Sequence, residues 1–96
     1  KGLVFCDTPM AGGTVGAKKG SLVFMVGADT RDEYEHAKIC LEGMGQKFFH
    51  CGEVGAGLAV KISHNLTLGI NMIASAEGMI LGERLGIDPK ILMQIL

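Results

Sequence analysis

The amino-acid sequence predicts an α/β fold in which a strand–helix–strand unit is followed by a long helix and the start of another. Short apolar runs bounded by Gly, Pro and Asp flank one amphipathic helical pattern in the first half of the chain. After Gly57 the residues read as helix almost without interruption. The composition shifts between Gly52 and Gly57, so we expect one domain to cover residues 1–54 and another to cover residues 55–96.

Composition limits the classes of partner. Nine basic and ten acidic residues give a formal net charge of −1, which removes the electrostatic argument for binding nucleic acid or an anionic membrane. At 48% hydrophobic residues, a packed core or a subunit contact must cover many aliphatic side chains. The longest apolar stretch, Leu66–Leu81, contains Asn71 and Glu77 and does not read as a membrane span.

The cysteines indicate the redox state of the protein's compartment rather than a disulfide or metal site. They are odd in number and include no C-x-x-C pair; they are Cys6, Cys40 and Cys51. This pattern speaks against a disulfide framework and against a zinc site, and it favours a reducing intracellular compartment.

The first elements are short. Leu3–Cys6 is an apolar run that predicts a strand, and Pro9 soon breaks it because proline cannot donate to a central ladder. The basic segment Gly16–Gly20 is bounded by glycines and predicts a loop. Ser21–Val26 predicts a second strand that ends at the following glycine.

A capped helix and a third strand follow. Asp29 and Thr30 are expected to cap the helix, and Thr30 with Glu33 fits the capping-box pattern. Gly45 is expected to stop the helix, and Lys47–Cys51 predicts the third strand. The apolar face of the helix comprises Tyr34, Ala37, Leu41 and Met44.

The second half predicts a helix over residues 57–85, which would span roughly 40 Å. Three glycines inside it each cost about 1 kcal/mol against alanine; they are Gly69, Gly78 and Gly82. They are tolerable if another helix packs closely, as in a helical bundle or a dimer contact. Gly86 ends this helix, and Asp88 with Pro89 opens the next. Both chain ends look cut, so we expect a fragment of a larger protein.

The segment Gly55–Asn65 is the strongest candidate for a site. A glycine pair opens the helix, and one turn later Lys61 and Asn65 share a face at i,i+4 spacing. A lysine in apolar surroundings can donate or accept a proton beside an amide that orients a substrate oxygen, although spacing alone favours a solvated helix face. A dinucleotide fingerprint is rejected, because Val60 occupies the third glycine position and Glu77 lies in mid-helix.

The remaining polar motifs are weak by themselves. Ala11–Gly13 is a candidate anion cradle, since glycines let backbone N–H groups approach a carboxylate, but an ordinary turn explains it better. His64 next to the turn of Lys61 is typical of a hydrogen-bonded structural residue. His36 and His50 have no partners at ligand spacing, so no metal site is predicted.

Three segments, in their order and spacing, resemble the β-hydroxyacid dehydrogenase family: Asp7–Gly13, Gly20–Gly27 and Gly55–Asn65. The resemblance extends through Ala74–Met79 and Leu85–Pro89. It implies the C-terminal strands of a Rossmann-type nucleotide-binding domain, a long interdomain helix and the start of an all-α domain. It also implies NAD as cofactor, with NADP not excluded, while the residues of the main dinucleotide fingerprint are unknown and expected outside this chain.

The same resemblance implies roles for individual residues. Lys61 matches the catalytic lysine, the general acid/base on the substrate hydroxyl, and Asn65 matches the asparagine that holds the substrate beside it. Gly12 and Gly13 match the backbone donors to the substrate carboxylate. Ala11 stands where the family usually has serine, which removes a hydroxyl contact and leaves the substrate open.

The implied activity is reversible oxidation of a short hydroxyacid, with 3-hydroxyisobutyrate from valine breakdown as the leading substrate and its semialdehyde as the product. There are two alternatives. One is a related short hydroxyacid dehydrogenase of the tartronate or succinic semialdehyde type, and the other is a non-catalytic dehydrogenase-like oligomerisation module. We expect a homo-oligomer with no nucleic-acid or membrane partner, in the mitochondrial matrix of a eukaryote or the cytoplasm of a bacterium. The piece alone is expected to be inactive and to self-associate.

Overall fold

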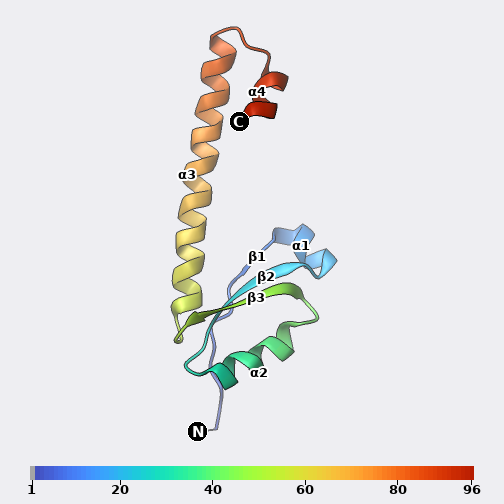
Figure 1. Ribbon diagram of the computed structural model, residues 1–96, viewed down its shortest axis with the longest axis vertical. Helices are drawn as coiled ribbons and strands as arrows, with labels where there is room; N and C mark the ends of the chain where they lie inside the picture. Colours follow the sequence, from blue (N-terminus) through green and yellow to red (C-terminus); the bar gives the residue numbers. More distant parts are fainter. Residues whose placement is uncertain (1) are drawn as a thin grey trace. The chain divides into compact units, whose positions relative to one another are not determined.

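The computed structural model describes residues 2–96, so Lys1 lies outside the described part. The chain divides into two compact units, one comprising the residues through Ser63 and the other His64–Leu96. The first unit holds a three-stranded sheet, two short helices and the first turns of a long helix, which continues into the second unit (Figure 1). In chain order the elements are β1 (Met10–Ala11), α1 (Gly13–Lys19), β2 (Leu22–Gly27), α2 (Arg31–Leu41), β3 (Gly45–Gly52), α3 (Ala56–Arg84) and α4 (Pro89–Ile95).

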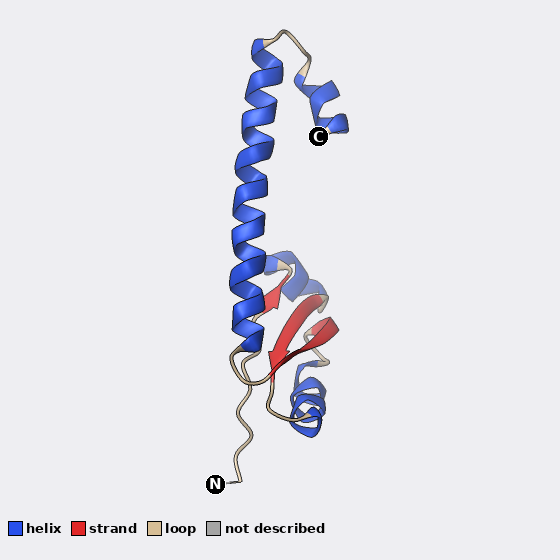
Figure 2. Ribbon diagram, turned by 60° about the vertical axis from the view of Figure 1, so that its left-hand side comes forward, coloured by secondary structure: helices blue, strands red, loops and turns tan. Residues whose placement is uncertain are grey.

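The sheet has the order β1-β2-β3, so β2 is the central strand (Figure 2). β2 and β3 are parallel, and α2 connects them, which confirms the predicted strand–helix–strand unit. β1 pairs antiparallel to β2 with Met10 opposite Phe24 and Ala11 opposite Val23. The turn after β1 therefore lies at the amino end of β2.

The core of the first unit is built around β2. Its inward side chains and two neighbours form one buried cluster, comprising Leu22, Phe24, Val26, Ala28 and Tyr34. The ring of Phe24 stacks on that of Phe48 from β3, with 5.8 Å between the ring centroids. β2 thus contributes most of the buried residues of this unit. Its two ends contact the turn after β1 and the start of α3.

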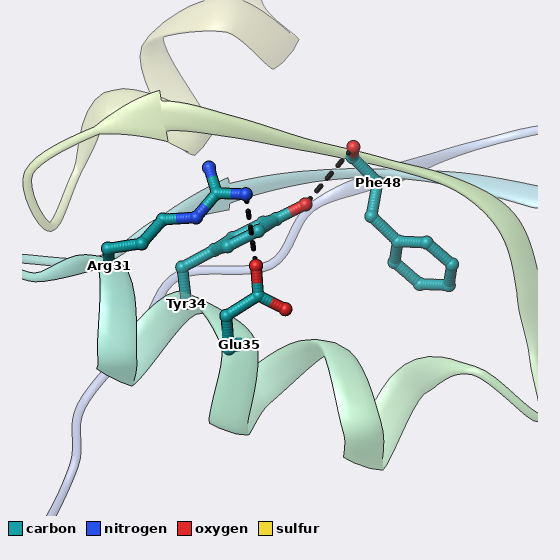
Figure 3. Close-up of polar contacts among 4 residues, drawn as sticks. All are labelled: Arg31, Tyr34, Glu35 and Phe48. Atoms are coloured by element: carbon teal, nitrogen blue, oxygen red, sulfur yellow. Dashed lines mark hydrogen bonds and ion pairs between the residues drawn. The ribbon is translucent and has the colours of Figure 1, made fainter.

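Tyr34 ties α2 to β3, as Figure 3 shows. Its hydroxyl donates to the carbonyl oxygen of Phe48 over 3.2 Å, and its ring stacks on His50 at a centroid distance of 4.9 Å. The guanidinium of Arg31 lies 4.7 Å from the centre of the tyrosine ring and pairs with Glu35 at 3.0 Å. A buried phenol that keeps its hydrogen bond fixes α2 on the sheet without leaving a polar group unpaired.

Two of the early predictions are wrong. Leu3–Cys6 forms no strand, and the side chains of Leu3, Val4 and Phe5 are exposed. The chain pairs with β2 first at a single bridge between Asp7 and Gly27 and then at β1, after the proline. Gly16–Gly20, expected as a loop, belongs mostly to α1. This helix begins after Gly12 and ends at Gly20, whose left-handed conformation with φ 63° closes the helix.

The predicted capping box at the start of α2 is confirmed. The Thr30 hydroxyl accepts from the backbone N–H of Glu33 over 3.2 Å, and the Glu33 carboxylate accepts from the N–H of Thr30 over 3.1 Å. Asp29, expected to share the cap, instead accepts from the N–H of Val54 over 3.1 Å. It therefore braces the turn between β3 and α3.

The end of α2 differs from its prediction. The helix ends at Leu41, and Gly45, expected to stop it, is the first residue of β3. A Cβ at Gly45 would lie 2.6 Å from the carbonyl oxygen of Leu22. The glycine is thus required by close strand pairing rather than by helix termination.

The second unit contains the rest of α3 and all of α4. Close packing was expected at the three internal glycines, and it is found at Gly82, where a Cβ would meet the side chain of Leu92. A Cβ on Gly78 would lie 3.4 Å from Leu96, whereas one on Gly69 would meet nothing within 4 Å in this chain. A dimer contact at Gly69 stays a prediction. Asp88 caps α4 as predicted, its carboxylate accepting from the N–H of Lys90 over 2.9 Å. Within the described residues, no helix has the length and apolar character that crossing a bilayer demands.

Candidate active site

Lys61 lies in the second turn of α3 with its side chain partly buried. Within residues 2–96 its side-chain nitrogen has neither a hydrogen bond nor an ion pair. Asn65 is exposed, four positions along the same helix and in the second unit. Its amide oxygen lies 3.4 Å from Nδ1 of His64.

The first turn of α3 rests directly on β2. Gly57 is buried there, and a Cβ on it would lie 3.0 Å from the amide nitrogen of Gly27 and would also strike the carbonyl oxygen of Met25. Only a glycine allows the helix backbone to come this close to the strand. The position of Lys61, one turn further on, is thereby set by contact with the carboxyl end of β2.

The glycine turn lies at the other end of the same strand. Gly12 and Gly13 have φ of 132° and 60°, and both are exposed. A Cβ on Gly12 would lie 3.1 Å from Leu22, whereas one on Gly13 would meet nothing within 4 Å. No side chain caps α1 at Gly12, so the N–H groups of its first turn are left to solvent or to an anion.

β2 is the common support of the two predicted halves of the site. The glycine turn contacts it at Leu22, and α3 contacts it at Met25 and Gly27. Among residues 2–96, no hydrogen bond or ion pair joins Lys61 directly to the glycine turn. Within the first unit, the structure thus anchors both halves on one strand.

Asp7 is the residue that sequence reasoning missed. One carboxylate oxygen accepts from the N–H of Gly55 over 2.6 Å, and the other accepts from the N–H of Leu58 over 2.6 Å. Asp7 also exchanges two backbone hydrogen bonds with Gly27. Its partners are 48 and 51 residues away in the chain, so no local pattern could have indicated this contact.

Two thiols near this region have raised pKa values. Burial raises the pKa of Cys6, and the carboxylates of Glu33 and Asp7 raise it further. Burial also raises the pKa of Cys51, again with a contribution from Asp7. Thiols with raised pKa stay protonated near neutral pH, whereas thiolates are the reactive form. In the described part of the chain there is also no group of three or more His, Cys, Asp or Glu that could hold a metal ion.

The matches to known families cover both parts of the chain. Residues 1–52 match the family described as the NAD binding domain of 6-phosphogluconate dehydrogenase. Residues 55–96 match the family described as NAD-binding of NADP-dependent 3-hydroxyisobutyrate dehydrogenase. The chain belongs to the NAD-binding dehydrogenase family that the first of these models describes. This confirms the resemblance inferred from the sequence, and with it the α/β fold class with Rossmann-type strands.

Individual relatives in this dehydrogenase family are close. Human mitochondrial 3-hydroxyisobutyrate dehydrogenase is 50% identical over 95 residues, which make up 99% of this chain and 28% of the human protein. The Pseudomonas aeruginosa enzyme is 42% identical over 96 residues and 32% of its own length. The solved structure of the Mycobacterium tuberculosis enzyme with L-serine has a TM-score of 0.86 and 39% identity, over 94% of this chain and 31% of that one. The chain therefore spans less than a third of these dehydrogenases.

NAD(P) is the cofactor of this dehydrogenase family, but the α3 junction of this chain does not fit its phosphates. A dinucleotide pyrophosphate binds to free N–H groups at the start of a helix that follows a strand. At α3 the N–H groups of Gly55 and Leu58 already donate to Asp7. A second anion there would also face the carboxylate, so no phosphate site is assigned to this junction.

Proposed function

We propose that the intact protein containing this chain oxidises 3-hydroxyisobutyrate reversibly to its semialdehyde, with NAD as the hydride acceptor. The observation that carries this proposal is Lys61 itself. It is a partly buried lysine without a hydrogen-bond or ion-pair partner among residues 2–96, on a helix whose first turn contacts β2 at Gly57. Membership of the dehydrogenase family supports the reaction class.

Each proposed site residue has a role that follows from its chemistry. In its neutral amine form, Lys61 takes the proton of the substrate hydroxyl during oxidation while the hydride passes to NAD, and in its ammonium form it returns the proton during reduction. Asn65 orients the substrate beside the lysine through its amide. Gly12 and Gly13, both exposed and without side chains of their own, bind the substrate carboxylate with backbone N–H groups. Ala11 precedes these donors and contributes no hydroxyl.

We further propose that residues 1–54 are the end of the nucleotide-binding domain and that residues 55–96 are the interdomain helix and the start of the helical domain. Many apolar side chains along α3 are exposed, among them Leu66, Ile70, Met72, Ile73 and Leu81. Exposed apolar surface of this extent favours a homo-oligomer. The mitochondrial and bacterial relatives favour the mitochondrial matrix in a eukaryotic source and the cytoplasm in a bacterial one.

A substrate panel tests the proposed activity. The intact protein is assayed for formation of NADH or NADPH with three substrates, each with NAD and with NADP. They are 3-hydroxyisobutyrate, the hydroxyacid that gives tartronate semialdehyde and the hydroxyacid that gives succinic semialdehyde. We expect the highest kcat/KM with 3-hydroxyisobutyrate and NAD. A clear preference for another hydroxyacid would reassign the substrate, and no reduced cofactor with any of them would favour a non-catalytic oligomerisation module.

Ala11 favours the second candidate, a dehydrogenase for a related short hydroxyacid, because the usual serine hydroxyl is missing. A hydrogen bond to a charged carboxylate contributes about 1.5–3 kcal/mol. If 3-hydroxyisobutyrate is the substrate, Ala11→Ser should therefore raise its kcat/KM by about tenfold or more. Ala17→Ser, on the exposed side of α1, is the matched control. A fall in kcat/KM on Ala11→Ser alone would indicate a pocket shaped for another substrate.

A further inference from the structure

We propose that Asp7 is a positioning residue for Lys61. It holds the first turn of α3 on the sheet, and through this turn it fixes where the ammonium group lies. The inference rests on the proposed role of Lys61. In it, Asp7 affects turnover without contacting the substrate or the cofactor.

The carboxylate of Asp7 spans the start of α3. One oxygen takes the N–H of Gly55, just before the helix, and the other takes the N–H of Leu58, inside its first turn, both over 2.6 Å. Hydrogen bonds that an ionised carboxylate accepts are shorter and stronger than those between neutral groups. A negative charge at this end also matches the positive end of the helix dipole. The two bonds therefore fix both the distance of the first turn from the sheet and its rotation about the helix axis.

Asp7 is itself fixed on β2. Its N–H donates to the carbonyl oxygen of Gly27 over 3.2 Å, and the N–H of Gly27 donates back to the carbonyl oxygen of Asp7 over 2.9 Å. Its carboxylate fits between two glycines, because a Cβ on Gly27 or on Gly57 would collide with it. The strand, the carboxylate and the helix thus form one continuous connection.

This connection ends one turn before the candidate catalytic group. Lys61 follows Leu58 by three residues in an unbroken helix, so a tilt or rotation of the first turn moves its ammonium as well. Proton transfer requires the amine to lie within hydrogen-bond reach of the substrate hydroxyl. Loss of one anchor of the turn should therefore reduce the rate of turnover more than it reduces binding.

Asp29 offers a matched control. Its carboxylate accepts from the N–H of Val54, in the same turn but before the helix begins. Asp29→Asn removes the same charge from the same turn. It leaves the two hydrogen bonds of Asp7 in place.

The test is Asp7→Asn in the intact protein. Asparagine keeps the shape and one acceptor oxygen but presents an NH₂ group to the second N–H. We expect kcat to fall about 10- to 100-fold, with the KM for 3-hydroxyisobutyrate and for NAD unchanged within about twofold. Asp29→Asn should leave kcat near that of the unmodified protein. Equal losses in the two variants, or an unchanged kcat in Asp7→Asn, would overturn the proposal.

A double variant separates positioning from folding. In the Lys61→Ala background, Asp7→Asn should cause no further loss, because the lysine through which it acts is gone. The same fold-loss in both backgrounds would refute the proposal. Near-normal activity of Lys61→Ala would instead refute the proposed function. Hydrogen exchange of Asp7→Asn should show faster exchange confined to residues 55–61, and loss of protection throughout β2 and β3 would assign Asp7 to folding alone.

Discussion

Lys61→Ala is expected to lower kcat of the intact protein about 10²- to 10⁴-fold while the Kd for NAD changes little. The variant removes the only atom group in the proposed site that exchanges a proton with the substrate hydroxyl. Alanine is the best helix former, so α3 should persist and the loss should be chemical. Steady-state kinetics gives kcat, and isothermal titration calorimetry gives the affinity for NAD.

Lys47→Ala is the control for this experiment. Lys47 is an exposed lysine of β3 in the same unit, and its removal should leave kcat unchanged. A Lys61→Ala variant that retained near-normal kcat would end the assignment of the lysine as the general acid/base. A parallel loss in Lys47→Ala would point to a general effect of charge.

Gly57→Ala is expected to have the largest effect on stability. The added Cβ would meet backbone atoms of Met25 and Gly27 and the carboxylate of Asp7, and backbone atoms in a central strand cannot yield as a flexible side chain can. Overpacking of this kind costs about 1–3 kcal/mol and occasionally more. Denaturant unfolding of the intact protein, followed by circular dichroism, should show the lower midpoint.

Gly69→Ala is the matched control in the same helix. A Cβ there meets no other atom within 4 Å, so the change should stabilise the helix by about 0.4–1 kcal/mol. If both variants shifted the midpoint by the same amount and in the same direction, close packing at Gly57 could not be the cause.

Local patterns predicted the elements that depend on local contacts. The capping box of Thr30 and Glu33, the Asp88 cap and the extent of α3 all rest on residues within a few positions of each other. β1 was missed because its two residues become a strand only by pairing with β2. Gly45 was misread because a glycine required by strand packing looks the same in sequence as one that stops a helix.

The same difference between local and long-range contacts separates the site residues that were predicted from the one that was missed. Lys61 was singled out by its spacing on a helix and by the family resemblance, both of which are visible in the sequence. Asp7 was not, because its role depends on two glycines and two amide groups that only the fold brings around its carboxylate. Its distance in the chain from those amides conceals it from any window-based pattern.

That distance has a consequence for how the protein matures. Asp7 leaves the ribosome long before α3, and 51 residues that include β2, α2 and β3 separate it from Leu58. Closing a contact across so much chain is a late and entropically costly event. A nascent α3 can coil early by itself, but the lysine on it reaches its working position only when the sheet is complete. Appearance of activity during refolding should therefore lag behind appearance of helix.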